Sequence, residues 1–256
     1  MDFEGKVAVV AGGAAGIGAE IAAALGRRRA CVVVGDINRS GAEQTADEIT
    51  RAGGTALAVE FDIADEAAVA GLFDATNSAF GGVDMLANVA ADLSAPTLGP
   101  DSDHDISTVP LDVFDRTLDI DLRGYVLTLR QALPVMVARG GGSIVNISSG
   151  AAFVGEPRRA AYASAKAAIN ALTRHVASAF GRHNIRCNSI APGIVLTEAS
   201  RQAMGEERAA KLGSRNPSGR VGAPADIAGP AVFLLSDDAA WITGQVLSVD
   251  GGTTMR

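Results

Sequence analysis

Residues 6–18 read KVAVVAGGAAGIG, and this stretch decides the fold class of the protein. Its first part, through Ala11, is a continuous apolar run that predicts a strand buried on both faces. Gly12, Gly16 and Gly18 follow, and the alanine-rich residues after them predict a helix. Glycines at such a turn let a pyrophosphate approach the backbone, and the helix N-terminus offers it N–H donors. The alternative interpretation is a tight strand-to-helix turn that binds no ligand.

The rest of the chain alternates apolar runs with helical patterns. The predicted strands are residues 6–11, 31–36, 55–62, 84–90, 143–149, 184–193 and 245–252, and the predicted helices are residues 19–29, 40–52, 65–80, 112–139, 160–183 and 224–235. Parallel strands need crossover helices, so this alternation indicates an α/β fold. We expect a doubly wound, parallel, seven-stranded sheet with helices on both faces. Because no linker or break in composition interrupts the pattern, we expect a single domain over residues 1–256.

Composition and charge limit the kinds of binding partner and the cellular compartment that we expect for this protein. The net charge of −7 disfavours nucleic acid and anionic membranes, which both reward a basic surface. No apolar run approaches the roughly 20 residues that a membrane span needs, and the first residues lack the features of a signal peptide. Cys31 and Cys187 lie in apolar runs and are expected to be buried thiols. We therefore expect a cytoplasmic protein that binds neither nucleic acid nor membrane.

Two acids at predicted strand ends point to the adenosine half of a dinucleotide. Asp36 ends the second predicted strand, 18 residues after Gly18. An acid there can hydrogen-bond both ribose hydroxyls and repels a 2′-phosphate, which favours NAD over NADP. Arg39 lies nearby and keeps the NADP alternative open. Asp62 ends the third predicted strand and could hydrogen-bond the adenine, although a helix-capping or surface role is nearly as good an interpretation.

Residues 149–166, SGAAFVGEPRRAAYASAK, carry three groups suited to proton transfer. Tyr162 and Lys166 are four residues apart, which places them one turn apart on one helix face. A nearby ammonium favours the phenolate form of a phenol. Such a phenol can exchange a proton with an alcohol or carbonyl oxygen, and Ser149 could hydrogen-bond that same oxygen. The plain alternative is a surface turn of an ordinary helix.

Together these residues resemble the classical short-chain dehydrogenase/reductase family over nearly the whole chain. Gly12, Gly16 and Gly18 match its glycine motif, Asn88 stands where its N-N-A-G motif begins, and Ser149, Tyr162 and Lys166 match its catalytic residues. Pro192, Gly193 and Thr197 match its P-G-x-x-x-T stretch, and residues 248–252, SVDGG, are typical of its end. The resemblance implies a Rossmann fold, a nicotinamide cofactor, hydride transfer at a secondary alcohol or ketone, and a homotetramer. The cofactor contacts assigned on this basis are Gly12, Gly16, Ile17, Gly18, Asp36, Ile37, Asp62, Ile63, Asn88, Tyr162, Lys166, Pro192, Gly193, Val195 and Thr197.

Three positions depart from the family pattern. Ala11 replaces the usual Thr, and residues 89–91, Val-Ala-Ala, replace N-A-G; both concern packing more than chemistry. The third is Asp121, which stands where the family has its catalytic Asn, the residue that helps to hold a water linked to the lysine. A carboxylate near Lys166 would partly offset the ammonium charge. We therefore predict a fourth catalytic position at Asp121, with retained activity and a pH optimum moved to alkaline values. The rival interpretation is a member that has lost turnover.

Two segments follow strand ends and are expected to form the walls of a substrate site, residues 92–111 and 197–219. The residues expected at these walls are mixed and do not name a substrate: apolar Leu93, Leu98, Val154 and Met204, and charged Arg158, Arg159 and Glu198. No metal site is expected, because the acidic run at residues 101–112 lacks the Gly and Glu of a calcium loop. Trp241 is expected in the core or in a subunit contact. Besides NAD-dependent alcohol oxidation, two functions stay open: an NADP-dependent 3-oxoacyl-type reductase and a cofactor-sensing protein without turnover.

Overall fold

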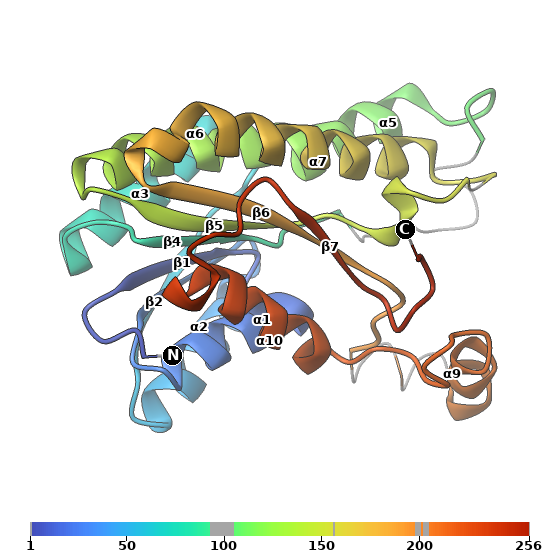
Figure 1. Ribbon diagram of the computed structural model, residues 1–256, viewed down its shortest axis with the longest axis horizontal. Coiled ribbons are helices and arrows are strands. Elements are labelled where there is room, and N and C mark those ends of the chain that lie inside the picture. The colour runs from blue at the N-terminus through green and yellow to red at the C-terminus, as the bar shows by residue number, and fades with distance from the viewer. Residues whose placement is uncertain (1, 93–104, 156, 198–200, 202–204, 256) are drawn as a thin grey trace.

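Seven parallel strands form one sheet in the order β3-β2-β1-β4-β5-β6-β7 (Figure 1). The computed structural model describes residues 2–92, 105–155, 157–197, 201 and 205–255. The strands are β1 (Val7–Ala11), β2 (Cys31–Asp36), β3 (Thr55–Glu60), β4 (Met85–Asn88), β5 (Gly142–Ile147), β6 (Ile185–Pro192) and β7 (Val246–Val249). The chain therefore runs outward from β1 to β3, returns to β4 beside β1 and continues to β7. The prediction of a doubly wound, parallel, seven-stranded sheet is confirmed.

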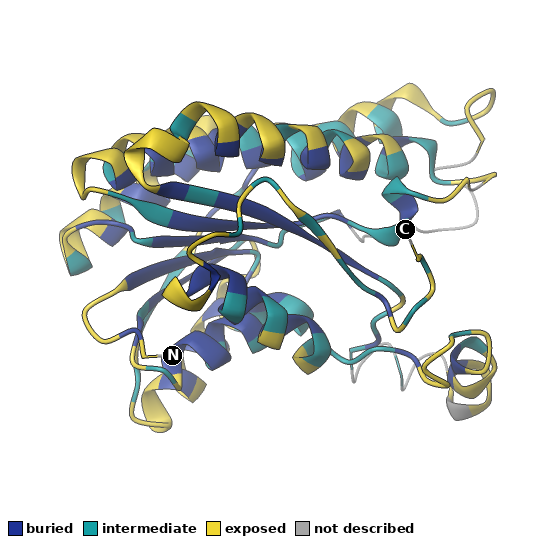
Figure 2. Cartoon of the chain, in the orientation of Figure 1, coloured by how far each residue is buried: buried dark blue, intermediate teal, exposed yellow. Residues whose placement is uncertain are grey.

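Helices cover both faces of the sheet in two layers (Figure 1). One layer consists of α1 (Gly16–Gly26), α2 (Arg39–Arg51) and α10 (Pro224–Leu235), and the other of α3 (Glu66–Phe80), α5 (Leu111–Leu118), α6 (Gly124–Ala138) and α7 (Ala160–Phe180). The inner strand β1 is buried throughout and divides its side chains between the two cores. Ala8 and Val10 pack toward the first layer, and Val9 and Ala11 toward the second, as the period of two in a strand requires. In Figure 2 the strands between the two layers are largely buried, and exposed residues lie on the outer faces of the helices.

The segment predicted as one helix over residues 112–139 is interrupted near its start. A π-helical turn, Asp119–Arg123, separates α5 from α6. Such turns occur mostly as single insertions in helices and are frequent at functional sites. Here the turn carries Asp121, which is fully buried although residues on either side of it are partly exposed.

Between β6 and α10 the chain forms a small outlying unit around α9 (Glu206–Gly213). In Figure 1 this helix stands apart from the two layers. A satellite core of Leu196, Ala209 and Val221 holds it together. Four of the residues predicted to form walls of the substrate site lie outside the described residues: Leu93, Leu98, Glu198 and Met204. Among the described helices, none is long and apolar enough to cross a membrane.

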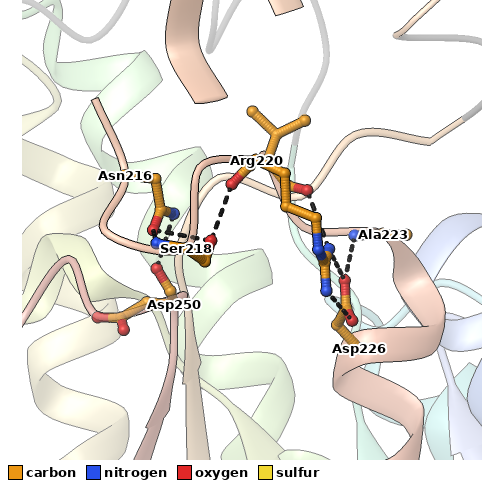
Figure 3. Close-up of polar contacts among 7 residues, drawn as sticks. Asn216, Ser218, Arg220, Ala223, Asp226 and Asp250 are labelled. Atoms are coloured by element: carbon orange, nitrogen blue, oxygen red, sulfur yellow. Dashed lines mark hydrogen bonds and ion pairs between the residues drawn. The ribbon is translucent and has the colours of Figure 1, made fainter. Parts of the chain in front are cut away.

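Polar contacts at two places tie this outlying unit to the body of the protein (Figure 3). The guanidinium of Arg220 donates two hydrogen bonds, of 2.6 and 2.7 Å, to the two carboxylate oxygens of Asp226 near the start of α10. Asp226 also accepts a hydrogen bond from the N–H of Ala223, the residue before that helix. These donors hold the pKa of Asp226 down at about 2. On the other side, Asn216 donates to the carbonyl of Asp250, which follows β7.

Candidate active site

The glycine loop lies at the carboxyl end of β1 and leaves no room for side chains. A Cβ atom on Gly18 would lie 1.9 Å from the carbonyl oxygen of Gly12, and one on Gly12 would lie 2.5 Å from the nitrogen of Ala90. Gly16 has a φ of +57°, and a Cβ there would lie 2.9 Å from Thr197. The backbone of the loop therefore packs against itself and against residues that follow β4 and β6. The helix α1 begins within this loop, at Gly16.

Asp36 lies at the end of β2 and is tied to this loop. One carboxylate oxygen accepts a hydrogen bond of 2.9 Å from the N–H of Ala14, and the other accepts one of 2.9 Å from the N–H of Asn38. Arg39, the nearby cation, donates at 2.8 Å to Glu43 on its own helix and lies 4.0 Å from Glu60. Asp36 is thus fixed beside the loop, while the charge of Arg39 is matched by acids.

A cavity of about 660 Å³ runs along the carboxyl ends of the strands. This volume lies in the usual range for ligand sites. Of the predicted site residues, those that line it are Gly12, Gly16, Ile17, Gly18, Asp36, Ile37, Asp62, Ile63, Ser149, Tyr162, Lys166, Pro192, Gly193, Val195 and Thr197. The structure therefore brings the glycine loop, the acid of β2 and the Ser-Tyr-Lys set to one cavity.

Asn88 and Asp121 are the two predicted site residues that do not line this cavity. The side chain of Asn88 is fully buried and bridges two neighbours: its amide N–H donates to Asn146 at 3.0 Å, and its amide oxygen accepts from Thr128 at 2.8 Å. These bonds join β4 to β5 and α6. Both ends of the side-chain amide are thus used inside the protein, and a contact of Asn88 with the cofactor stays a prediction.

Tyr162 and Lys166 project from the first turns of α7, as their spacing predicts. The ammonium of Lys166 is buried, with a side-chain exposure of 2%, and lies 5.5 Å from the ring centre of Tyr162. It also lies 3.4 Å from the carbonyl oxygen of Ile147, at the end of β5. Ser149 follows β5 and caps a short turn, because its hydroxyl accepts a hydrogen bond from the N–H of Ala151 at 3.1 Å. The hydroxyls of Ser149 and Tyr162 therefore reach the cavity from two neighbouring elements.

Asp121 lies behind the cavity wall and forms a direct ion pair with Lys166. Its Oδ2 atom is 3.2 Å from the lysine Nζ, and its Oδ1 atom accepts a hydrogen bond of 2.8 Å from the N–H of Asp92. Among the described residues, the Lys166 ammonium is the one group that pairs with Oδ2. Burial raises the pKa of Asp121, while the Lys166 charge and the Asp92 N–H oppose that rise. The sequence predicts an acid near Lys166, and in the structure the carboxylate and the ammonium form a direct ion pair.

The ammonium of Lys166 is surrounded by more groups than the sequence motif contains. Burial by itself would lower its pKa, but the oxygens of Tyr125, Asp121 and Tyr162 outweigh this effect and raise it. Tyr125 is fully buried, its ring centre lies 5.3 Å from the ammonium, and its hydroxyl donates to the carbonyl of Ile147 at 3.2 Å. Burial also raises the pKa of Tyr125, which keeps this phenol protonated. Lys166 is therefore held as an ammonium.

Sequence reasoning missed Tyr125 and Arg116 near the Ser-Tyr-Lys set, and it named Arg159 without its contact with Tyr162. Tyr125 is four residues after Asp121, a spacing that could have placed both on one helix face. The guanidinium of Arg159 lies 5.3 Å from the ring centre of Tyr162, and its backbone has the left-handed φ of +64°, uncommon for a residue with a side chain. Arg116 pairs with Asp92 at 2.8 Å across the cavity wall. Arg159 is three residues before Tyr162, so that contact is local, whereas no spacing in the sequence indicates the pairing of Arg116 with Asp92, since 24 residues separate the two.

Comparisons with known proteins place the chain in a family. Residues 12–254 match a family model described as enoyl-(acyl carrier protein) reductase. A probable short-chain type dehydrogenase/reductase of Bradyrhizobium diazoefficiens is 46% identical over 98% of this chain and 88% of its own length. An L-rhamnose 1-dehydrogenase (NAD(P)+) of Sphingomonas sp. is 37% identical over 98% of this chain and 96% of its own length.

A solved structure is also similar to this chain over its full length. It is a 7α-hydroxysteroid dehydrogenase complexed with NADH and 7-oxo glycochenodeoxycholic acid, with 37% identity and a TM-score of 0.89, and the match covers 100% of this chain and 96% of that one. The chain therefore belongs to the short-chain dehydrogenase/reductase family of oxidoreductases. The family resemblance seen in the sequence is confirmed.

The residues present fit a nicotinamide dinucleotide. Side chains at Gly12, Gly16 or Gly18 would clash with the protein itself, so the loop keeps bare backbone at the cavity, beside the start of α1. Such a helix start favours a pyrophosphate. Asp36 lines the same cavity at the position where an acid can meet a ribose. The far end of the cavity reaches Ser149 and Tyr162, so a cofactor held at the loop and at Asp36 would extend toward these hydroxyls.

Proposed function

We propose that the protein is an NAD-dependent dehydrogenase that transfers a hydride between a secondary alcohol, or the corresponding ketone, and the nicotinamide. The observation that carries this proposal is the cavity itself. Ser149, Tyr162 and Lys166 open on the same cavity as the glycine loop and Asp36. A proton-transfer group and a dinucleotide site in one cavity are what alcohol oxidation requires.

In the proposed oxidation, Tyr162 as the phenolate accepts the proton of the substrate hydroxyl. Ser149 donates a hydrogen bond to the reacting oxygen and so fixes the carbinol carbon in place. When bound, the nicotinamide supplies the acceptor for the hydride that leaves this carbon. Lys166 stabilises the phenolate by its charge and would hold the hydroxyls of the nicotinamide ribose. In the reverse direction Tyr162 donates the proton to the ketone oxygen.

The preference for NAD over NADP rests on two charges. Asp36 is fixed at the cavity wall by the N–H groups of Ala14 and Asn38, so a 2′-phosphate would meet its negative charge. Arg39, the cation that could bind such a phosphate, is paired with Glu43. The relatives differ on this point, since the similar solved dehydrogenase contains NADH and the rhamnose dehydrogenase is named for both cofactors.

A second candidate function follows from the family model, whose description is a reductase of an enoyl-(acyl carrier protein). We keep an acyl-type reductase that uses NADP as this alternative, and Asp36 counts against it. The third candidate, a sensor without turnover, rests on Asp121, whose carboxylate offsets the charge of Lys166 at 3.2 Å.

We further propose a cytoplasmic homotetramer. Trp241 is fully exposed, which rules out its predicted core position. It precedes β7, the outermost strand of the sheet, where Leu247 is also exposed. An exposed strand edge with large apolar side chains favours association of subunits. Sedimentation velocity of the purified protein distinguishes a tetramer from a monomer.

The test of the proposed function is NADH formation over a panel of secondary alcohols that spans hydroxysteroids, hydroxyacyl esters, polyols and cyclic terpenols. We expect turnover with NAD on one class, and a loss of about 10²-fold or more in Tyr162→Phe, which keeps the ring but not the proton. Binding of NADH, followed by its fluorescence, should survive in the variant. Equal turnover by both proteins would contradict the assigned role of Tyr162. NADH binding without turnover would favour the sensor.

A further inference from the structure

One exposed cation lines the cavity among the residues that the structure describes. The charged side chains of this lining are Asp36, Asp62, Asp92, Arg116 and Lys166. Lys166 is buried and serves the reaction, whereas the side chain of Arg116 has an exposure of 59%. Arg116 is therefore the positive group in this lining that a ligand can reach from solvent.

Arg116 lies in the catalytic half of the cavity. Its partner Asp92 follows β4, which neighbours β5, the strand that leads to Ser149. Asp36 ends β2 and Asp62 follows β3, and both strands lie on the far side of β1 from β5. The N–H of Asp92 also donates to Asp121, the partner of Lys166. The guanidinium of Arg116 thus lies in the part of the cavity near Ser149, and not in the part near Asp36 and Asp62, where the adenosine is proposed to bind.

The guanidinium is held in one orientation by a single contact. Its Nε donates a hydrogen bond of 2.8 Å to Asp92, whose side chain has an exposure of only 4%. Within the described part of the chain, the Arg116 side chain has no other hydrogen bond or ion pair. The two Nη groups at the far end therefore have N–H donors to offer. Two parallel donors of this kind match the two oxygens of a carboxylate.

We infer that Arg116 binds a carboxylate of the substrate, so that the secondary alcohol which the enzyme oxidises belongs to a hydroxy acid. Asp92 acts as a positioning residue that fixes Nε and aims the other donors into the cavity. This inference rests on the proposed function, because it names the class of alcohol that reaches Tyr162. The apolar side chain of Ile120, one turn after Arg116 on the same wall, would face the carbon chain between the two polar ends.

The test compares hydroxy acids with their own methyl esters, which keep the alcohol and lose the charge. Hydroxy fatty acids with the alcohol at different distances from the carboxylate serve as the panel. In the wild-type protein we expect a lower KM for the acid. In Arg116→Gln we expect the KM for the acid to rise about tenfold or more, because a charged hydrogen-bond partner is lost. The KM for the ester, the KM for NAD and kcat should change little.

Two further variants separate recognition from folding. Arg116→Lys keeps the charge near Asp92 but not the paired donors, so it should retain part of the preference for the acid. Arg130→Gln removes an exposed arginine on α6, away from the cavity lining, and should match the wild type. A melting temperature close to that of the wild type would exclude a general loss of structure in Arg116→Gln.

A second arm measures binding without turnover and so decides the inference separately. The protein with NADH bound is titrated with oxo acids and with their methyl esters, and the NADH fluorescence is followed. Tighter binding of the acid that disappears in Arg116→Gln supports the inference even if no alcohol is oxidised. Equal affinity for acid and ester in the wild type, or an unchanged preference in the variant, would overturn it while leaving the dehydrogenase proposal intact.

Discussion

Replacing Asp121 by Asn should move the pH dependence of alcohol oxidation to lower pH. In the native protein the carboxylate of Asp121 lies 3.2 Å from the ammonium of Lys166 and offsets its charge. That ammonium lies 5.5 Å from the ring centre of Tyr162, the residue proposed to act as phenolate. Asn keeps an acceptor for the N–H of Asp92 but carries no charge. The lysine would then favour the phenolate more strongly.

The size of the shift follows from these distances. The attraction between a full ammonium charge and a phenolate 5.5 Å away is about 3 kcal/mol at an effective dielectric constant of about 20. This energy corresponds to about 2 pH units, and Asp121 cancels only part of the charge. We therefore expect the rising limb of log(kcat/KM) for alcohol oxidation to move down by about 1 to 2 pH units in Asp121→Asn.

The assay is a pH profile of NADH formation from about pH 6 to 11 with the best alcohol of the panel. Asp119→Asn is the matched control, because Asp119 is an exposed acid on the same π-helical turn and its charge is screened by solvent. It should shift the limb far less. Profiles of Asp121→Asn and the wild type that coincide would refute the electrostatic account of this residue.

Three further substitutions test other parts of the structure. Gly18→Ala should abolish NADH binding as measured by fluorescence, because the new Cβ would lie 1.9 Å from the carbonyl oxygen of Gly12. The control Gly71→Ala, in open space on α3, should bind NADH normally. Its free energy of unfolding in urea should rise by about 0.5–1 kcal/mol. Asp36→Ala should improve kcat/KM with NADP relative to NAD by about tenfold or more, since a repelling charge is removed; an unchanged ratio would contradict the role of Asp36. Asp226→Asn should lower the free energy of unfolding by about 1 kcal/mol at pH 7, because an exposed pair with Arg220 and a helix cap are both weakened. Since the pKa of Asp226 is depressed to about 2, this difference should be present above about pH 4 and vanish as the pH falls toward 2.

The sequence was sufficient for the fold because its periodic signals agree with one another. Continuous apolar runs such as that of β2 require burial on both faces, and the helices between them supply it. Signals at helix ends were equally clear: Asp65 accepts hydrogen bonds from two N–H groups at the start of α3, and Gly81 ends it in a left-handed conformation. The π-helical turn was missed, because its residues continue the helical pattern on both sides.

The site could be predicted where it depends on local spacing and less well where it depends on contacts between distant segments. Tyr162 and Lys166 belong to one helix, so their separation of four residues fixed their relation. Asn88 was assigned to the cofactor from its motif position alone, and only the neighbouring Asn146 and Thr128 show how its amide is used. The same limit hid the pairing of Arg116 with Asp92, since 24 residues separate the two.

The most direct test of the central proposal uses the best alcohol of the panel with deuterium on its carbinol carbon. If Tyr162 accepts the hydroxyl proton while the hydride passes to the nicotinamide, mass spectrometry should find NADH one mass unit heavier. Tyr162→Phe should form this labelled NADH at about 10² times lower rate or less. Unlabelled NADH from the wild-type protein would contradict direct hydride transfer and with it the proposed function.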